Sequence, residues 1–303
     1  MAQQSEIIAG TLFAEQEAEF VRRRSNLWRD AFYRLIRNKL AVVGMFMVGI
    51  LVFTAVFADV LMPKGRDTIY YGHQQEPPSS EFWLGTDFES RDMLSRLIYG
   101  ARVAVMVGLA TQAIILLIGV TIGAVAGYFG GRVDTFLMRL VDIWYAVPAL
   151  LFAMLIMIML GQGLFNLFLA IGFIQWVTLS RLVRGQLLSL REKEFVKAAR
   201  VAGTGGFGII VRHLLPNALT PIIVAVTFGI PQAIFTEATL SFFGIGINPP
   251  TPSWGQMVGA YQTYLRSAPH MAVFPALCIA FTMLGFTFFG DGLRDALDPK
   301  MNQ

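Results

Sequence analysis

The sequence predicts an all-α protein that crosses a membrane several times. Hydrophobic residues make up 55% of the chain and charged residues only 15%, against roughly 25% charged residues in a soluble domain. Apolar runs of about 20 residues, the length that a helix needs to cross a bilayer core about 30 Å thick, recur along the chain. Continuous runs such as 146–160 do not suit β-barrel strands, whose apolar positions alternate over about 10 residues. We therefore expect six transmembrane helices.

The predicted spans follow a tail and are separated by loops of unequal length. Residues 1–39 form a predicted cytoplasmic tail, 63–101 and 246–270 form predicted external loops, and 184–216 form a predicted cytoplasmic loop. The six predicted spans cover residues 40–62, 102–128, 137–160, 164–183, 217–245 and 271–291.

Residues 26–39 of the tail have the pattern of an amphipathic helix. Apolar residues recur near helical spacing, and basic residues lie between them. The apolar residues are Leu27, Trp28, Phe32, Leu35 and Ile36, and the basic residues are Arg29, Arg34, Arg37 and Lys39. We expect a helix at the membrane interface. A simple basic flank before the first span is the alternative.

The first span begins near residue 40 and is longer than the apolar core of a secretory signal peptide. It also lacks a convincing small-residue cleavage site, so we expect it to remain as an uncleaved anchor.

The only cysteine, Cys278, lies in the sixth span, which excludes an internal disulfide and a cysteine metal cluster.

The distribution of basic residues predicts the orientation of the chain, because lysine and arginine resist transfer across the membrane during insertion. With the amino terminus inside, 18 of the 24 lysines and arginines fall in cytoplasmic segments or at the cytoplasmic ends of the spans, and most exceptions lie in the long first external loop. Both termini are therefore expected in the cytoplasm. The pI near 9.3 then reflects topology and contact with anionic membrane lipid, and no nucleic-acid partner is expected.

The predicted cytoplasmic loop contains a short helix with one face of small residues. Four apolar residues lie at i, i+3, i+4 and i+7, and charged residues occupy the other faces. The apolar residues are Phe195, Ala198, Ala199 and Ala202, and the charged residues are Arg191, Glu194, Lys197 and Arg200. Such a face lets the surface of another protein approach closely. The pattern alone is equally compatible with an ordinary surface helix that packs on its own loop.

Glycine and proline predict where the helices of this loop end. Gly203 is expected to stop the first helix in a left-handed conformation, and further glycines extend the bend. A second short helix, over 209–215, is expected to end ahead of Pro216, because the proline ring disfavours a helical conformation in the residue before it.

The loop resembles the cytoplasmic signature of bacterial binding-protein-dependent ABC transporter permeases. That signature has two alanines, a glycine four residues after the second, and a Leu-Pro pair near its end. In this chain it falls on Ala198, Ala199, Gly203, Leu215 and Pro216. The resemblance implies that the helix docks in a groove of a separate ATPase, with Glu194, Phe195 and Arg200 completing the coupling residues. Lys197 stands where a glutamate is usual, so the ionic role is assigned to Glu194.

Further stretches resemble the dipeptide and oligopeptide branch of that family. These are Trp83–Val105, Ala126–Pro148, Pro249–Gly255 and Phe289–Lys300. The resemblance implies the type I ABC importer permease fold, with residues 102–303 as the permease core. It also implies a multi-pass subunit of the bacterial plasma (inner) membrane that works with a second permease as a heterodimer, two ABC ATPases and an extracytoplasmic solute-binding protein. The implied substrate is a dipeptide or oligopeptide.

ATP hydrolysis is expected on partner subunits. A G-x-G-x-x-G occurs at Gly203, Gly205 and Gly208, but a predicted helix rather than a strand precedes it, and no acidic residue lies near 20 positions on. The chain has no Gly-Lys pair, so it lacks a phosphate-binding G-x-x-x-x-G-K-[ST] loop. We expect no catalytic residue and no cofactor in this chain, with ATP and Mg²⁺ bound by the partner ATPases.

Polar residues inside the spans are candidates for the translocation pathway, because an Asp there costs about 2.5 to 3.5 kcal/mol on insertion scales. The candidates are Gln112, Asp142 and Glu237. For Asp142 the alternative is a pair with Arg139 at i, i+3, and for Glu237 it is an interhelical hydrogen bond. A competing class of function is an ion-coupled carrier that titrates Asp142 and Glu237, although we find no inverted repeat. A membrane scaffold or receptor without transport is a third class.

The predicted external loops carry aromatic residues that we expect to receive the solute-binding protein. Trp83 and Trp254 are the candidates, and anchoring at the membrane interface is the alternative. His73, His213 and His270 are too scattered for a metal site, so no metal is expected. Import of nickel, another metal chelate or a glutathione-like peptide by the same machinery is the alternative to dipeptide or oligopeptide import.

Overall fold

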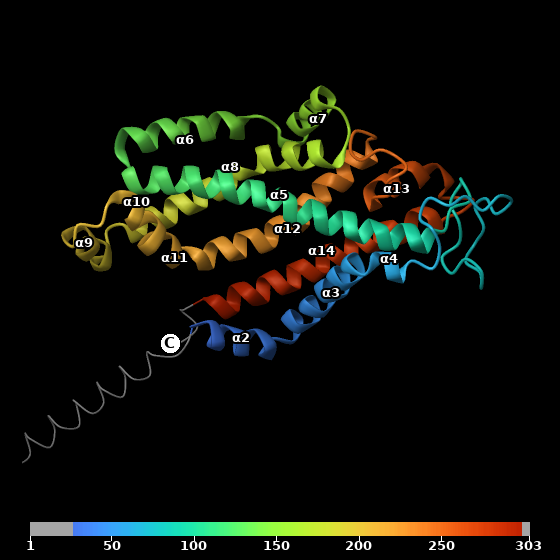
Figure 1. Ribbon diagram of the computed structural model, residues 1–303, viewed down its shortest axis with the longest axis horizontal. Coiled ribbons are helices and arrows are strands. Elements are labelled where there is room, and N and C mark those ends of the chain that lie inside the picture. The colour runs from blue at the N-terminus through green and yellow to red at the C-terminus, as the bar shows by residue number, and fades with distance from the viewer. Residues whose placement is uncertain (1–26, 299–303) are drawn as a thin grey trace, which may run out of the picture.

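A computed structural model of the chain describes residues 27–298 and is nearly all helical, which confirms the predicted fold class. Five of the described helices are long and apolar enough to cross a membrane, and one bent pair brings the candidate spans to six. The long helices run roughly along the longest axis of the molecule (Figure 1). Two parts of the chain lie outside the described residues. They are the predicted tail up to residue 26, with Arg22–Arg24, and the terminal residues 299–303, with Lys300.

The helices form one set of long elements with short elements at the two ends. The long elements are α3 (Lys39–Val56), α5 (Met93–Phe129), α8 (Leu164–Leu190), α12 (Leu219–Phe242) and α14 (His270–Leu297), and the bent pair is α6 (Gly131–Ala146) with α7 (Ala149–Leu160). The short elements are α2 (Leu27–Arg37), α4 (Ala58–Leu61), α9 (Glu194–Val201), α10 (Gly206–Ile209), a π-helical turn (Ile210–Leu214), α11 (Leu215–Asn217), α13 (Trp254–Tyr261) and a 3₁₀ turn (Gln262–Tyr264). Helices α9 and α13 mark opposite ends, which we name the α9 end and the α13 end (Figure 1).

The third predicted span, 137–160, is not one continuous helix. It consists of α6 and α7, whose axes differ by 85°. Pro148 causes the break, because it has no N–H for the helical ladder and forces the preceding residue out of the helical region. Val147 accordingly has an extended backbone, with φ −83° and ψ 129°.

The second predicted span, 102–128, lies within a longer helix. Helix α5 starts nine residues earlier, at Met93. Asp92 caps it, because its carboxylate accepts a hydrogen bond from the backbone N–H of Ser95 at 2.8 Å. The helix therefore extends beyond the apolar run into the segment that was predicted as loop.

Helices α5 and α8 make the most extensive helix contact because α5 presents glycines to α8. Gly119, Gly123 and Gly127 are spaced by four residues and lie on one face of α5. A Cβ on Gly127 would lie 2.8 Å from the carbonyl oxygen of Arg184, and a Cβ on Gly123 would overlap that of Ser180. Small residues at this spacing let the two backbones approach closely.

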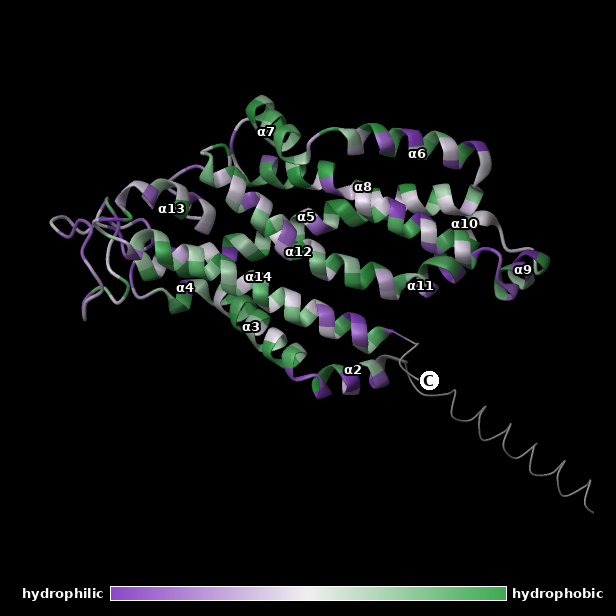
Figure 2. Ribbon diagram, turned by 180° about the vertical axis from the view of Figure 1, so that it is seen from behind, coloured by the Kyte–Doolittle hydropathy of each residue, from purple (hydrophilic) through white to green (hydrophobic). Residues whose placement is uncertain are grey.

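Helix α2 packs on the end of α14 as well as carrying the predicted amphipathic pattern. Ala31 and Leu35 are buried in a cluster with Ala296, while Phe32 and Tyr33 are exposed. The chain turns at residue 38, where the Asn38 side chain accepts hydrogen bonds from the first N–H groups of α3. Apolar residues follow the long helices, and hydrophilic residues gather in the loop at the α13 end (Figure 2).

Candidate functional site

Helix α9 turns one face into the protein. Val196 is fully buried and Ala199 is 7% exposed. Both belong to a hydrophobic cluster that includes Ile115 of α5, Leu187 of α8 and Ile222 of α12. Close-packed interiors transmit displacement, so this cluster, which we name the α9 anchor, links any movement of α9 to three long helices.

The opposite face of α9 is open to the surroundings. Phe195, Ala198 and Ala202 are exposed, and Val201 is 90% exposed. The structure thus divides the predicted face of small residues, because Ala199 packs inward while Val201 joins the outward face. Figure 1 shows α9 projecting beyond the ends of α5 and α8.

Charged residues at the two ends of α9 match the helix dipole. Glu194 is exposed in the first turn, where a negative charge is favourable, and Arg200 lies in the last turn. The Arg200 guanidinium lies 5.8 Å from the ring centroid of Tyr128, at the end of α5. Gly206 also contacts the Tyr128 ring, so the loop rests on the end of α5.

The end of α9 follows the glycine prediction. Gly203 has φ +79°, in the left-handed region, and its N–H donates to the carbonyl of Arg200 at 3.0 Å. The N–H of Thr204 donates to the carbonyl of Ala199 at 3.0 Å, which closes the helix end.

The second short helix, predicted over 209–215, is present, but its predicted end ahead of Pro216 is wrong, because the chain stays helical from Gly206 to Asn217. A π-helical turn occupies Ile210–Leu214 between the short helices α10 and α11. The turn lies just before Pro216, whose missing N–H interrupts the ladder of hydrogen bonds. Leu215 is partly buried against the α9 anchor and Pro216 is exposed, so the two coupling residues predicted from the resemblance lie in the same loop as α9.

A cavity of about 960 Å³ lies between α5, α8, α12 and the bend between α6 and α7. Its wall is mainly apolar, with three glutamine and three threonine side chains besides the aromatic residues of the bend. The glutamines and threonines are Gln112, Gln175, Thr178, Gln232, Thr236 and Thr239. No Asp, Glu, Lys or Arg occurs among the described residues that line it.

Two of the cavity amides differ in how they are satisfied. The Gln175 amide donates to the Thr236 hydroxyl at 3.1 Å, joining α8 to α12. Gln112, a predicted pathway residue, is 4% exposed and its Nε2 has no hydrogen-bond partner among the described residues. Its amide lies against Gly229, where any Cβ would collide with it. Gln112 therefore lies in the cavity wall.

The bend between α6 and α7 forms one side of this cavity. Trp144, Tyr145 and Pro148 are among the residues that line it. Non-helical backbone at membrane depth is tolerated where it lines a cavity or is buried in protein. The break at Pro148 therefore lies where the surroundings can accommodate it.

Asp142 forms an ion pair with a residue that the sequence analysis did not consider. Its Oδ1 lies 2.8 Å from Nη2 of Arg181 on α8, and not beside Arg139 of its own helix. The predicted i, i+3 pair is therefore wrong, because the long Arg181 side chain reaches α6 from the neighbouring helix. Asp142 is not itself among the cavity-lining residues.

Glu237 is buried away from the cavity, in the last part of α12. The Ser241 hydroxyl donates to its carboxyl at 2.7 Å, and the same hydroxyl oxygen accepts from the N–H of Ile247 at 3.1 Å. The carboxyl therefore helps to hold the turn that follows α12. Its hydrogen-bond partner Ser241 lies four residues further along the same helix, and Glu237 does not line the cavity. These two observations do not support a pathway role for Glu237.

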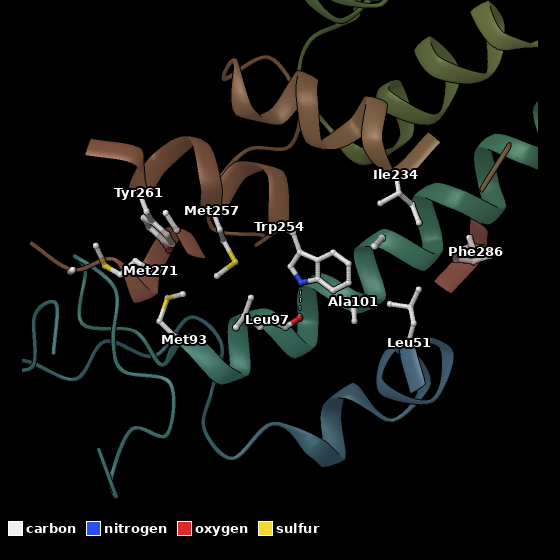
Figure 3. Packing of buried hydrophobic residues seen from close by; sticks show 13 residues of the cluster. Leu51, Met93, Leu97, Ala101, Ile234, Trp254, Met257, Tyr261, Met271 and Phe286 are labelled. Atoms are coloured by element: carbon white, nitrogen blue, oxygen red, sulfur yellow. Dashed lines mark hydrogen bonds between the residues drawn. The ribbon is translucent and has the colours of Figure 1, made fainter. Parts of the chain in front are cut away.

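The two predicted docking tryptophans lie in different environments. Trp83 is 68% exposed, in the loop before α5. Trp254 is 5% exposed, and its Nε1 donates to the carbonyl of Leu97 at 3.0 Å (Figure 3). Its ring fills the space left by Gly100. Trp254 is therefore reassigned to packing between α13 and α5, and Trp83 stays a docking candidate.

A buried polar network holds the loop before α5 against α13. Asp87 is fully buried and accepts hydrogen bonds from Nε of Arg91 at 2.8 Å and from the hydroxyl of Tyr261 at 3.0 Å. Arg96, also fully buried, lies 3.6 Å from the same carboxylate. Burial raises the pKa of Tyr261 well above its ordinary value.

Sequence reasoning missed Arg181 and, among the glutamines and threonines of the cavity, all but Gln112. It considered the acidic residues, whose burial costs most, together with Gln112, and it passed over the other neutral polar side chains. The spacing of Gln232, Thr236 and Thr239 at i, i+4 and i+7 in an apolar helix was an available signal of a polar stripe.

The described residues contain no group of three or more His, Cys, Asp or Glu side chains that could hold a metal ion.

Residues 119–303 match the family described as binding-protein-dependent transport system inner membrane component, and residues 26–78 match the N-terminal TM domain of oligopeptide transport permease C. The chain is 40% identical over 288 residues to the oligopeptide transport system permease protein OppC of Bacillus subtilis, covering 95% of this chain and 94% of that protein. It is 41% identical over 274 residues to the dipeptide transport system permease protein DppC of Alkalihalophilus pseudofirmus, covering 90% of each.

Another relative is the glutathione transport system permease protein GsiD of Pectobacterium atrosepticum, 38% identical over 275 residues, with 90% of this chain and 91% of that protein covered. Among solved structures, a chain of the MetNI methionine ABC transporter in inward-facing conformations matches with a TM-score of 0.54 and 18% identity. That match covers 68% of this chain and 98% of the other, and it shows a shared fold.

Proposed function

This chain belongs to the family of binding-protein-dependent transport system inner membrane components, and we propose that it is the permease subunit of an ATP-driven peptide importer. It is a multi-pass protein of the inner membrane. Relatives named for oligopeptide, dipeptide and glutathione transport support a peptide substrate. Glutathione is itself a small peptide, so these three names share one substrate class. We propose no metal-chelate substrate, since no observation favours it.

In the proposed orientation the α9 end faces the cytoplasm and the α13 end faces outward. The excess of lysine and arginine in the segments at the α9 end supports this orientation. A solute-binding protein then meets the outer loops, where Trp83 is exposed. Two ATPase subunits act from the cytoplasm, with ATP and Mg²⁺ bound there, and a second permease completes the pathway.

The geometry of α9 carries the proposal. Its outward face, with Phe195, Ala198 and Val201, is free to enter a groove on an ATPase. Its inward face, with Val196 and Ala199, belongs to the α9 anchor. A push on α9 is therefore passed to α8 and α12, and both helices line the cavity.

The proposed mechanism is alternating access driven by the ATPases. ATP binding closes the two ATPases, moves each permease's coupling helix and switches the side to which the cavity opens. A ligand shifts a conformational equilibrium only by its differential affinity for the two states, so ATP binds the outward-open complex more tightly. No residue of this chain makes or breaks a covalent bond in this scheme.

Cysteine crosslinking tests the coupling role with a matched pair of alanines. Cys278, the only native cysteine, is first replaced by serine. A cysteine at the exposed Ala198 is expected to crosslink to an ATPase subunit in the assembled complex, while a cysteine at the buried Ala199 should react far less. ATP-driven peptide uptake without any crosslink from Ala198→Cys would overturn the proposed coupling surface.

The ion-coupled carrier is not supported as a second candidate. It needs Asp142 and Glu237 as a titrating pair, but Asp142 pairs with Arg181 and Glu237 binds Ser241. Family membership points to ATP-driven transport instead.

A further inference from the structure

The Asp142–Arg181 ion pair joins two helices of candidate membrane spans and leaves both side chains partly exposed. The Asp142 side chain is 55% exposed and the Arg181 side chain 39% exposed. Both residues lie in helices that are candidate membrane spans, where a charged side chain is too costly to face lipid, so they face either an aqueous path or another protein. The surroundings of the pair decide between these two.

The pair lies at the rim of the cavity. The Arg181 guanidinium lies 4.3 Å from the ring centroid of Tyr145, and Tyr145 lines the cavity. Thr178, three residues before Arg181, and Ala146, four residues after Asp142, also line it. Residues at this spacing share a helix face, so both charges lie about one helical turn, roughly 5 Å, from the cavity wall.

The pair lies on the side of the cavity that is nearer the α9 end. Helix α6 begins at that end, so Asp142 precedes the lining residues Tyr145 and Ala146, and α8 runs toward it, so Arg181 follows Thr178. The cavity itself offers only neutral amides and hydroxyls among its described lining residues. Those groups can satisfy a peptide backbone but cannot balance a charged terminus.

We propose that Asp142 and Arg181 form a zwitterion site at the mouth of the cavity, which exchanges their mutual ion pair for the two termini of a passing peptide. This inference rests on the proposed function as a peptide importer. Arg181 takes the carboxylate, because its planar fork matches two carboxylate oxygens, and Asp142 takes the ammonium group. Exchange conserves net charge, and a half-exposed pair is weak enough to open.

Peptides blocked at one terminus test the site. The complete complex with its binding protein, in proteoliposomes, is given trialanine, N-acetyl-trialanine or trialanine amide, and ATP-dependent uptake is measured. The readout is the ratio of free to blocked uptake in a variant divided by the same ratio in the wild type. The binding protein discriminates between free and blocked peptides equally in variant and wild type, so its effect cancels from this quotient.

Each substitution is expected to act on one terminus. Arg181→Gln should lower the preference for free over amidated peptide about fivefold, and Asp142→Asn should lower the preference for free over acetylated peptide by a similar factor. Arg181→Lys keeps the charge but loses the planar fork, so it should lower the same preference less than Arg181→Gln does, by about twofold. If Arg181→Gln fails to assemble, Arg181→Lys supplies the measurement, because its preference for free over amidated peptide should still fall, whereas a pair that only joins α6 to α8 predicts the wild-type ratio.

A second ion pair between the same helices provides the control. Asp134 pairs with Arg184, with Nη2 and Oδ2 2.6 Å apart, and neither residue lines the cavity. Asp134→Asn should leave both ratios unchanged. Where the binding protein rejects a blocked peptide, saturation-transfer NMR of the same peptides on the complex without binding protein supplies the ratio.

Two results overturn the proposal. One is unchanged ratios in both Arg181→Gln and Asp142→Asn with measurable uptake, which would make the pair a staple between α6 and α8 only. The other is an equal shift in Asp134→Asn, which would make the effect a general loosening of α6. Failure of the wild-type complex to import trialanine with ATP defeats the proposed function itself and is thus distinguishable from either result.

Discussion

Replacing Val196 with alanine is expected to loosen α9 from the rest of the protein without touching its outward face. Val196 is fully buried in the α9 anchor. The substitution removes two methyl groups at about 0.8 kcal/mol each, and the hole that remains brings the loss to about 2 to 3 kcal/mol. The population of α9 detached from its anchor should therefore rise roughly 30- to 150-fold.

Hydrogen exchange measures this population directly, because the backbone amides of α9 exchange when the helix detaches. In Val196→Ala, exchange over 197–203 should accelerate while the middle of α5 and α8 stays protected. Peptide uptake per ATP hydrolysed should fall in the assembled complex, because motion of the ATPase is no longer passed to α8 and α12.

Val201 supplies the matched control, since it has the same side chain on the same helix but is 90% exposed. Val201→Ala should leave hydrogen exchange in the isolated permease unchanged and weaken only the association with the ATPase. Equal exchange in wild type and Val196→Ala would refute the reasoning, as would equal acceleration in the two variants. Either result would mean that the α9 anchor does not hold the helix.

Two further predictions concern stability of the purified chain in detergent. Gly123→Ala should lower the stability by about 1 to 3 kcal/mol, because its Cβ would overlap the Ser180 carbonyl, whereas Gly185→Ala meets open space and should be neutral or stabilising; equal thermal unfolding of the two variants would contradict this. Tyr261 holds its proton more tightly when folded, since burial raises its pKa. The contribution of Tyr261 to the free energy of unfolding is therefore fully present below pH about 10 and is lost as pH rises above that value. Unfolding followed from pH 8 to 11 should show this loss in wild type and not in Tyr261→Phe, and parallel curves would exclude it.

Most of the spans and the short helix α9 could be predicted from the sequence because the physics behind them is local. A run of about 20 apolar residues crosses a bilayer as a helix whatever surrounds it. Gly203 ends α9 with φ +79° because the left-handed conformation suits a residue without a Cβ. The periodicity of the apolar residues also predicted α9 itself, and the predicted end differs by one residue from the observed end at Val201. The same local rule at Pro148 was available, and applying it would have divided the third span.

The candidate site needed the tertiary structure because periodicity defines faces of a helix but not their neighbours. Ala198 and Ala199 are equivalent in the sequence pattern, yet one is exposed and the other packs in the α9 anchor. Trp254 lies in a predicted external loop, where an aromatic residue is expected at the surface. In the structure its ring is buried against Gly100, and the carbonyl of Leu97 accepts its hydrogen bond.

The partner of Asp142 shows the same division between local and tertiary determinants. Its own helix offers Arg139 one turn away, whereas the packing of α6 beside α8 brings Arg181 within 2.8 Å. That packing also sets the neutral cavity next to the pair, since its wall comes from four separate parts of the chain. The sequence by itself thus determined where helices form and which residues share a helix face. The packing of the helices decided the neighbours of each side chain, because contacts between distant segments leave no periodic trace in one sequence.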